Sequence, residues 1–125
     1  MQFVGKINKE IYQCITENIL TDEVIITDER IAHIRDRHPG DYEKFFHYIS
    51  GIIAEPDYII ASNKKNTAVL LKNFEEKDRK FKVILRLKLE TEPFSYKNSI
   101  VSFWHIGETT WKKTIKNKLV LYKRT

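Results

Sequence analysis

Hydrophobic and polar positions alternate through the second half of the chain and predict a β-sheet there. The alternation is clearest in Phe81–Leu89, where the odd-numbered positions are apolar and three of the even-numbered positions are basic. Side chains of a strand point alternately to its two faces, so this pattern is typical of an antiparallel strand with one buried and one solvated face. The solvated face is predicted to be basic. By the same pattern, strands are predicted at Tyr58–Ser62, Thr67–Phe74, Phe81–Leu89, Ser99–Ile106 and Leu119–Lys123.

Helical periodicity dominates the segment before Pro56. A stripe of aromatic and aliphatic side chains predicts a helix over Asp41–Ala54, which Pro56 ends. A shorter helix is predicted to begin after Thr27, a suitable N-cap, and to stop at Pro39-Gly40. A third, Thr109–Asn117, is predicted to be capped by one of its two first threonines, with Trp111 and Ile115 directed inward.

The order of these elements predicts an α+β fold. We expect N-terminal helices packed on a four- to five-stranded antiparallel sheet, with a short helix before the last strand. The 125 residues are expected to form a single domain, 1–125. Residues 1–22 remain a poorly assigned N-terminal extension, although Phe3–Ile7 has the composition of a short strand.

The charge balance indicates an anionic partner. Lys and Arg outnumber Asp and Glu by 22 to 17, and the sequence pI is about 9.3. Such an excess favours nucleic acid first and an acidic protein or a membrane surface second, while a merely basic soluble domain is the plain alternative.

Several classes of protein are disfavoured by what the sequence contains. Cys14 is the single cysteine, which excludes an intrachain disulfide and a thiolate zinc cluster. His33 and His38 are five residues apart, not the four of a helical zinc pair, so no metal and no cofactor is predicted. The chain has no 18-residue apolar run and no signal-like segment, so we expect a cytoplasmic protein without membrane contact.

The short helix before Pro39 gathers histidines and arginines. Two adjoining stripes follow from its spacing, of which the second is apolar and is predicted to bury Ile31. The first stripe contains Arg30, His33 and Arg37; the second contains Ile31, Ile34 and His38. A histidine flanked by arginines suits a phosphate group. The alternatives are a solvated helix face and, for His38, a simple cap of the helix C-terminus.

These residue types fit cleavage of RNA without a metal. That reaction needs a base for the 2′-hydroxyl proton, an acid for the leaving oxygen, and cations around the phosphate. The candidate catalytic residues are His33, His38, Arg37, Arg86, Ser102 and Tyr122. The candidate substrate-binding residues are Arg30, Lys88, Trp104 and Lys123. Trp104 would stack on a base if it lies on the solvated face, and it belongs to the core if it faces the helices. Arg86 in a cross-strand ion pair, Ser102 as an ordinary sheet hydroxyl and Tyr122 in packing are the structural alternatives.

Several segments together resemble a known family. They are Val24–Ile34, Arg37-His38-Pro39, Pro56–Ile60, Asn98–Ser102 and Leu121–Lys123. In them the chain resembles phage-associated nuclease-like families of the BECR type, which are grouped with barnase, EndoU, colicins E5 and D, and RelE. The resemblance implies helices on a four- or five-stranded antiparallel sheet and metal-independent RNA cleavage. It points to the same six candidate catalytic residues.

The sequence therefore predicts an endoribonuclease that cleaves RNA, such as tRNA or mRNA, by 2′-hydroxyl attack to a cyclic phosphate. The resemblance implies an association with toxins or mobile elements, and an inhibitor (antitoxin or immunity) protein as a partner. Two alternatives remain open: a non-catalytic nucleic-acid-binding module, and a phage structural or packaging accessory protein. The oligomeric state is left open.

Overall fold

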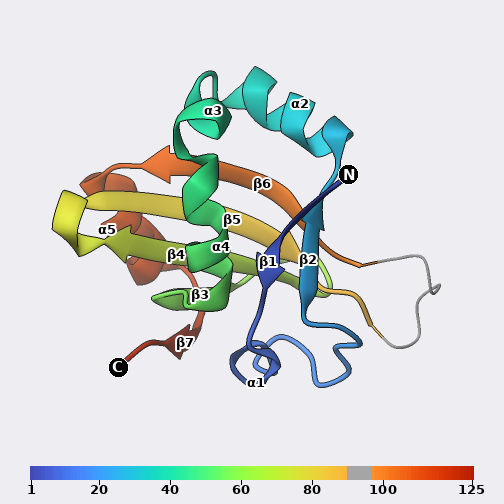
Figure 1. The fold of residues 1–125 in the computed structure, drawn as a ribbon. Coiled ribbons are helices and arrows are strands. Elements are labelled where there is room, and N and C mark those ends of the chain that lie inside the picture. The colour runs from blue at the N-terminus through green and yellow to red at the C-terminus, as the bar shows by residue number, and fades with distance from the viewer. Residues whose placement is uncertain (90–96) are drawn as a thin grey trace.

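The computed structural model describes residues 1–89 and 97–125, and within them one sheet carries helices on both faces (Figure 1). Its seven strands lie in the order β1-β2-β6-β5-β4-β3-β7. The strands are β1 (Gln2–Lys6), β2 (Glu23–Ile26), β3 (Tyr58–Ala61), β4 (Thr67–Phe74), β5 (Arg79–Arg86), β6 (Asn98–Ile106) and β7 (Val120–Lys123). The helices are α1 (Lys9–Tyr12), α2 (Asp28–Arg37), α3 (Asp41–Phe45), α4 (Ile49–Ala54) and α5 (Glu108–Asn117), with 3-10 turns η1 (Phe46–Tyr48) and η2 (Glu75–Lys77).

The α+β class is confirmed, but the sheet is larger than predicted and is mixed. The five strands predicted from alternation correspond to β3–β7, and β1 and β2 extend the sheet beyond them. β2 runs parallel to β6, with Val24 opposite Asn98, whereas the other pairings are antiparallel. Strands of four or five residues, one of them bulged near Gly5, are too short to show a clear period.

The first residues of the chain belong to this fold. β1 pairs with β2, and the side chain of Tyr12, in α1, is completely buried. Its hydroxyl donates a hydrogen bond of 2.6 Å to the carbonyl of Ile53 in α4. The segment 1–22 is therefore packed on the rest of the domain.

The long helix predicted over Asp41–Ala54 is divided into α3, η1 and α4. Phe45 leaves helical geometry, with φ −125° and ψ 1°, and the chain bends there. The bend lets two aromatic rings contact one residue of β5: the rings of Phe45 and Tyr48 lie 5.2 and 5.0 Å from that of Phe81. Tertiary packing thus interrupts a stretch that is helical by local pattern.

Helices lie on both faces of the sheet. The face of β5 that carries Phe81, Val83 and Leu85 is fully buried beneath the N-terminal helices, and we call it the core face. The opposite face, which carries Lys82, Ile84 and Arg86, is called the polar face. Figure 1 shows α5 behind the sheet, against this polar face.

α5 covers only part of the polar face. Its Trp111 and Ile115 point inward, as predicted, and pack in a second, smaller core around Ile60, Leu71 and Ile106. The predicted threonine cap is wrong, because the helix begins at Glu108, and Gly107 precedes it with no side-chain cap. The prediction that the whole basic face is solvated is also wrong, since α5 lies across β3 and β4.

α2 has the boundaries that its sequence predicts. The hydroxyl of Thr27 accepts the backbone N–H of Arg30 at 3.2 Å, and the helix ends at Arg37. Gly40 has φ +84°, a left-handed conformation that favours glycine. Ile31 is buried, as expected.

α2 and α3 lie beside the edge of β6 (Figure 1). β2 pairs with β6 only at Asn98 and Ser99, so the rest of β6 is approached by these helices instead. Among the described helices, none is long and apolar enough to cross a membrane.

Candidate functional site

The end of α2 and the middle of β6 meet at two aromatic rings. His38, the C-cap of α2, stacks on Trp104 with ring centroids 4.6 Å apart and planes inclined by 5°. Both side chains are half-buried. Stacking over this distance fixes the plane of the imidazole, because tilting it would forfeit contact area.

Three local features hold His38 in this position. Its N–H donates to the carbonyl of Ile34 at 2.8 Å, which closes the last turn of α2. The left-handed Gly40 then reverses the chain into α3. The carboxylate of Asp41 accepts the backbone N–H of His105 at 3.0 Å, so the corner between α2 and α3 is tied to β6.

Lys82 approaches the same indole from the neighbouring strand. It lies directly opposite Trp104 in the β5–β6 pairing, and its Nζ is 5.4 Å from the centroid of the ring. Burial is the main cause that lowers the pKa of the Lys82 ammonium, and the positive charge of Lys118 lowers this pKa further. Sequence reasoning missed Lys82 as a site residue, because several basic positions of β5 look equivalent until α5 is placed.

Ser102 and Arg86 extend the site along the polar face. Ser102 lies opposite Ile84, and Arg86 lies opposite Ser99, so both side chains share the face of Lys82. About 13 Å of extended backbone separates Lys82 from Arg86, with the row of Ser102 between them. We call His38, Lys82, Arg86, Ser102 and Trp104 the polar-face cluster.

The structure does not bring Tyr122 to this cluster. Tyr122 lies opposite Ile59 on β7 and packs against the main core, on the opposite face of the sheet. Lys123 is on the polar face but on the far edge strand, four strand spacings or about 19 Å from β6. Lys88 is 1% exposed, and its Nζ donates to the Leu89 carbonyl at 3.4 Å.

The remaining predicted residues of α2 lie on another side of the helix. His33 directly precedes the buried Ile34 and is turned from it by about 100°, whereas His38 is turned by only about 40°. Arg30 and His33 are half-buried and Arg37 is exposed. The two histidines of this helix are therefore separated, and only His38 contacts Trp104.

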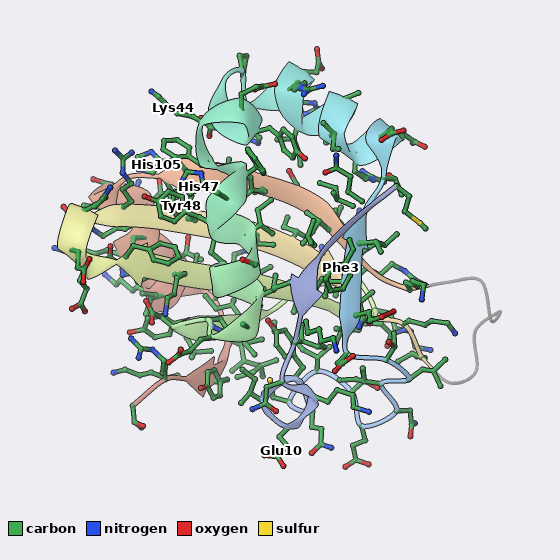
Figure 2. The ribbon with its side chains drawn as sticks, in the orientation of Figure 1. Phe3, Glu10, Lys44, His47, Tyr48 and His105 are labelled. Carbon is green, nitrogen blue, oxygen red and sulfur yellow. The ribbon has the colours of Figure 1, made fainter. Side chains whose placement is uncertain are left out.

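Two further histidines lie at the rim of the core face (Figure 2). The exposed His105 is 5.3 Å from the ring of Phe45, and the exposed His47 is 4.3 Å from the ring of Tyr48. Neither is a predicted site residue. His105 follows Trp104 directly in β6, so its side chain points to the face away from the polar-face cluster.

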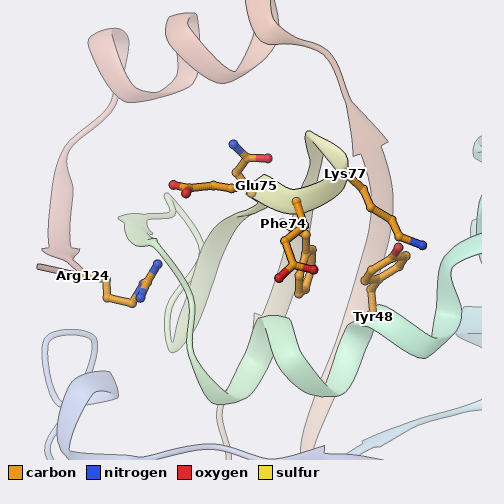
Figure 3. Close-up of a pocket in the computed structure, with 7 residues that line it drawn as sticks. Tyr48, Phe74, Glu75, Lys77 and Arg124 are labelled. Carbon is orange, nitrogen blue, oxygen red and sulfur yellow. The ribbon is translucent and has the colours of Figure 1, made fainter.

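A hollow of about 390 Å³ lies near the turn between β4 and β5 (Figure 3). Its lining includes Phe74, Glu75, Glu76 and Arg124. The guanidinium of Arg124 is already engaged by Asp57, at 2.9 Å, and by Glu55. The two glutamates repel an anion and the guanidinium is already engaged, so this hollow does not suit a phosphate group.

The residues that could ligate a metal are dispersed. Within residues 1–89 and 97–125, no three His, Cys, Asp or Glu side chains gather where one ion could bind them.

Comparisons with known proteins identify one family. Residues 2–123 match the family described as phage-Barnase-EndoU-ColicinE5/D-RelE like nuclease 2. Searches of curated proteins and of solved structures returned no match. The match spans nearly the entire chain and confirms the resemblance. It supports nuclease activity as the general function. The chain belongs to the phage-Barnase-EndoU-ColicinE5/D-RelE like nuclease 2 family.

Proposed function

We propose that this protein is an endoribonuclease that cleaves RNA without a metal ion, at the polar-face cluster. Membership of a nuclease family supports the class of reaction. The observation that carries the proposal is the contact of His38 with Trp104 beside Lys82, which joins a histidine and a cation from separate elements. Such convergence on one partly open surface is what acid–base chemistry at a phosphate requires.

His38 is the proton-transfer group in this proposal. Its neutral imidazole accepts the proton of the 2′-hydroxyl, and the resulting oxygen forms a bond to phosphorus. The bond from phosphorus to the 5′ oxygen breaks, and this oxygen receives a proton. Lys82 is suited to supply it, because burial lowers the pKa of its ammonium and makes it a stronger acid. The products are a 2′,3′-cyclic phosphate and a 5′-hydroxyl.

Arg86 and Ser102 are assigned to the phosphate oxygens. A guanidinium offers paired donors that match two oxygens of one phosphate, and its charge opposes the charge that develops in the transition state. The hydroxyl of Ser102 is a neutral donor on the adjacent strand. We assign Trp104 to orienting His38 rather than to stacking a base, since the imidazole already covers part of its ring.

The residues on the other side of α2 have a secondary role in this proposal. Arg30, His33 and Arg37 are assigned to the flanking RNA backbone, because they lie away from Trp104. A contact of this kind contributes to affinity more than to the rate of the chemical step.

A chimeric oligonucleotide with one ribose among deoxyriboses tests the reaction. We expect cleavage after that ribose in the presence of EDTA, with a cyclic phosphate end detected by mass spectrometry. The substitution His38→Ala should lower the cleavage rate by a factor of about 10²–10⁴. His47→Ala is the matched control, because His47 is an exposed histidine outside the cluster. Cleavage of the all-deoxyribose strand, loss of cleavage in EDTA, or an unaffected His38→Ala variant would each contradict the proposal.

A second candidate function is a non-catalytic nucleic-acid-binding module. The exposed lysines of α5 favour it, since Lys112 and Lys116 can contact phosphates whether or not the cluster is active. Such a module would bind RNA with an affinity that falls with salt, equally in the wild type and in His38→Ala, and would release no product.

A further inference from the structure

A separate hollow of about 280 Å³ opens on the polar face, between the C-terminal end of α5 and strands β3–β5. Its floor is made of apolar side chains of the strands. Its polar lining is Ser62 and Asn63 from the turn after β3, Lys82 from β5, and Thr114 and Lys118 from α5 and its end. Lys82 thus borders both this hollow and the indole of Trp104.

The two lysines of the hollow have no compensating charge. Among residues 1–89 and 97–125, no carboxylate lies within ion-pair distance of Lys82 or Lys118, and none lines the hollow. Other lysines of the sheet are compensated: Lys80 lies 2.9 Å from Glu108, and Lys72 lies 3.5 Å from Asp57. Lys82 is partly desolvated, and the positive charge of the exposed Lys118 adds to the cost of keeping it charged. An anion between the two ammonium groups therefore relieves an existing cost.

Neutral donors complete the lining. The Ser62 oxygen accepts the N–H of Lys64 at 3.1 Å, which leaves its own proton free to donate to a ligand. The amide of Asn63 offers two more donors. The hydroxyl of Thr114 is engaged, because it donates to the carbonyl of Thr110 at 2.7 Å. Two charges and several neutral donors around a small space are the recognition elements of a phosphate group.

We propose that this hollow binds a phosphate group between Lys82 and Lys118, with the Ser62 hydroxyl as a third donor. If the proposed function holds, this phosphate is not the one that is cleaved but a neighbouring phosphate of the same RNA strand. The strand then crosses the sheet from β6 towards β3, with Lys82 between the two positions. The substrate is accordingly an oligonucleotide that spans both positions, and a dinucleotide fills only the first.

Binding of inorganic phosphate, measured by calorimetry or by NMR titration, tests the hollow without any cleavage assay. Lys118→Gln should weaken phosphate binding by about tenfold, and Lys118→Arg, which keeps the charge, should restore most of it. Lys113→Gln removes an equal charge from an exposed position of α5 outside the hollow and is the matched control. Equal phosphate affinity in Lys118→Gln and Lys113→Gln overturns the proposal.

Cleavage of substrates of different length tests the role in RNA binding. Lys118→Gln should raise the KM for a pentanucleotide by a larger factor than the KM for a dinucleotide, and Lys113→Gln should affect the two substrates equally. The same change of KM for both lengths in Lys118→Gln overturns the subsite. If the wild type cleaves neither substrate, the proposed function fails, while the phosphate titration still decides whether the hollow is an anion site.

Discussion

His38 lies flat against Trp104, with 4.6 Å between the ring centroids and 5° between the ring planes. The imidazole follows the end of α2, in the first third of the chain, and the indole belongs to β6, in the last quarter of the chain. Their contact connects α2 to the polar face of the sheet. It therefore decides which of the two histidines of α2 lies beside the cations of β5.

The substitution Trp104→Ala removes the ring that orients His38. We expect kcat/KM for RNA cleavage to fall by on the order of 10–100-fold, because a loosely held imidazole is rarely in the reactive position. Trp104→Phe keeps a ring for stacking and should retain much more activity. The two variants are compared in the same oligonucleotide cleavage assay. Equal activity of both with the wild type would show that the stack has no role in positioning.

Substitutions of Tyr122 and Arg86 test which face of the sheet carries the site. Tyr122→Phe should change the cleavage rate by less than about twofold, because Tyr122 packs on the core face. Arg86→Ala should lower the rate by about 10²-fold through the loss of charge at the phosphate. Steady-state kinetics with one oligonucleotide compares them. A large loss in Tyr122→Phe together with a silent Arg86→Ala would move the site to the core face.

The lowered pKa of Lys82 predicts how phosphate binding varies with pH. Lys118, at the end of α5, is the charged group that acts on Lys82, whereas Leu71 and Trp104, directly opposite it on β4 and β6, are uncharged. Phosphate needs the charged ammonium, so affinity should decline as pH rises through the lowered pKa, below the ordinary lysine value of 10.5. Phosphate titrations at increasing pH measure this. In Lys82→Met this decline of phosphate affinity should disappear. A decline that persists in the variant would be due to another group.

The same shift predicts the pH dependence of stability. The folded-state pKa of Lys82 lies below its unfolded value, so the unfolded state binds more protons between these two values. The free energy of unfolding should therefore gain a contribution from this residue as pH rises through that window. Urea denaturation at several pH values compares the wild type with Lys82→Met, in which this contribution is absent. An identical pH profile in the two proteins would contradict the assignment.

Substitution by alanine should destabilise the protein at Gly40 and stabilise it at Gly51. Gly40 has φ +84° and open space around it, so Gly40→Ala carries the backbone cost alone, about 1–2 kcal/mol of lost stability. Gly51 lies in α4, and an added Cβ would make only ordinary contacts with Phe74 at 3.5 Å. Gly51→Ala should therefore stabilise the protein by up to about 1 kcal/mol. Urea unfolding midpoints measure both, and a loss of stability in each variant would contradict the assigned backbone of Gly51.

Local patterns were sufficient for much of the fold. The alternation along β5 correctly separates a buried row from a polar row, because the side-chain period of a strand is a local property. The start and end of α2 were also predictable, since Thr27 satisfies a free N–H and Gly40 tolerates a left-handed turn. The parallel pairing of β2 with β6 was not, because it joins segments far apart in the chain.

The residue types available on α2, β5 and β6 follow from the amino-acid sequence alone, as does the family to which the chain belongs. Which of these residues meet depends on the three-dimensional fold. It placed Trp104 against His38 and Tyr122 on the opposite face, and it laid α5 across the sheet so that Lys82 and Lys118 border one hollow. The physical reason is that helix packing over a sheet depends on the summed contacts of many residues, which no local period contains.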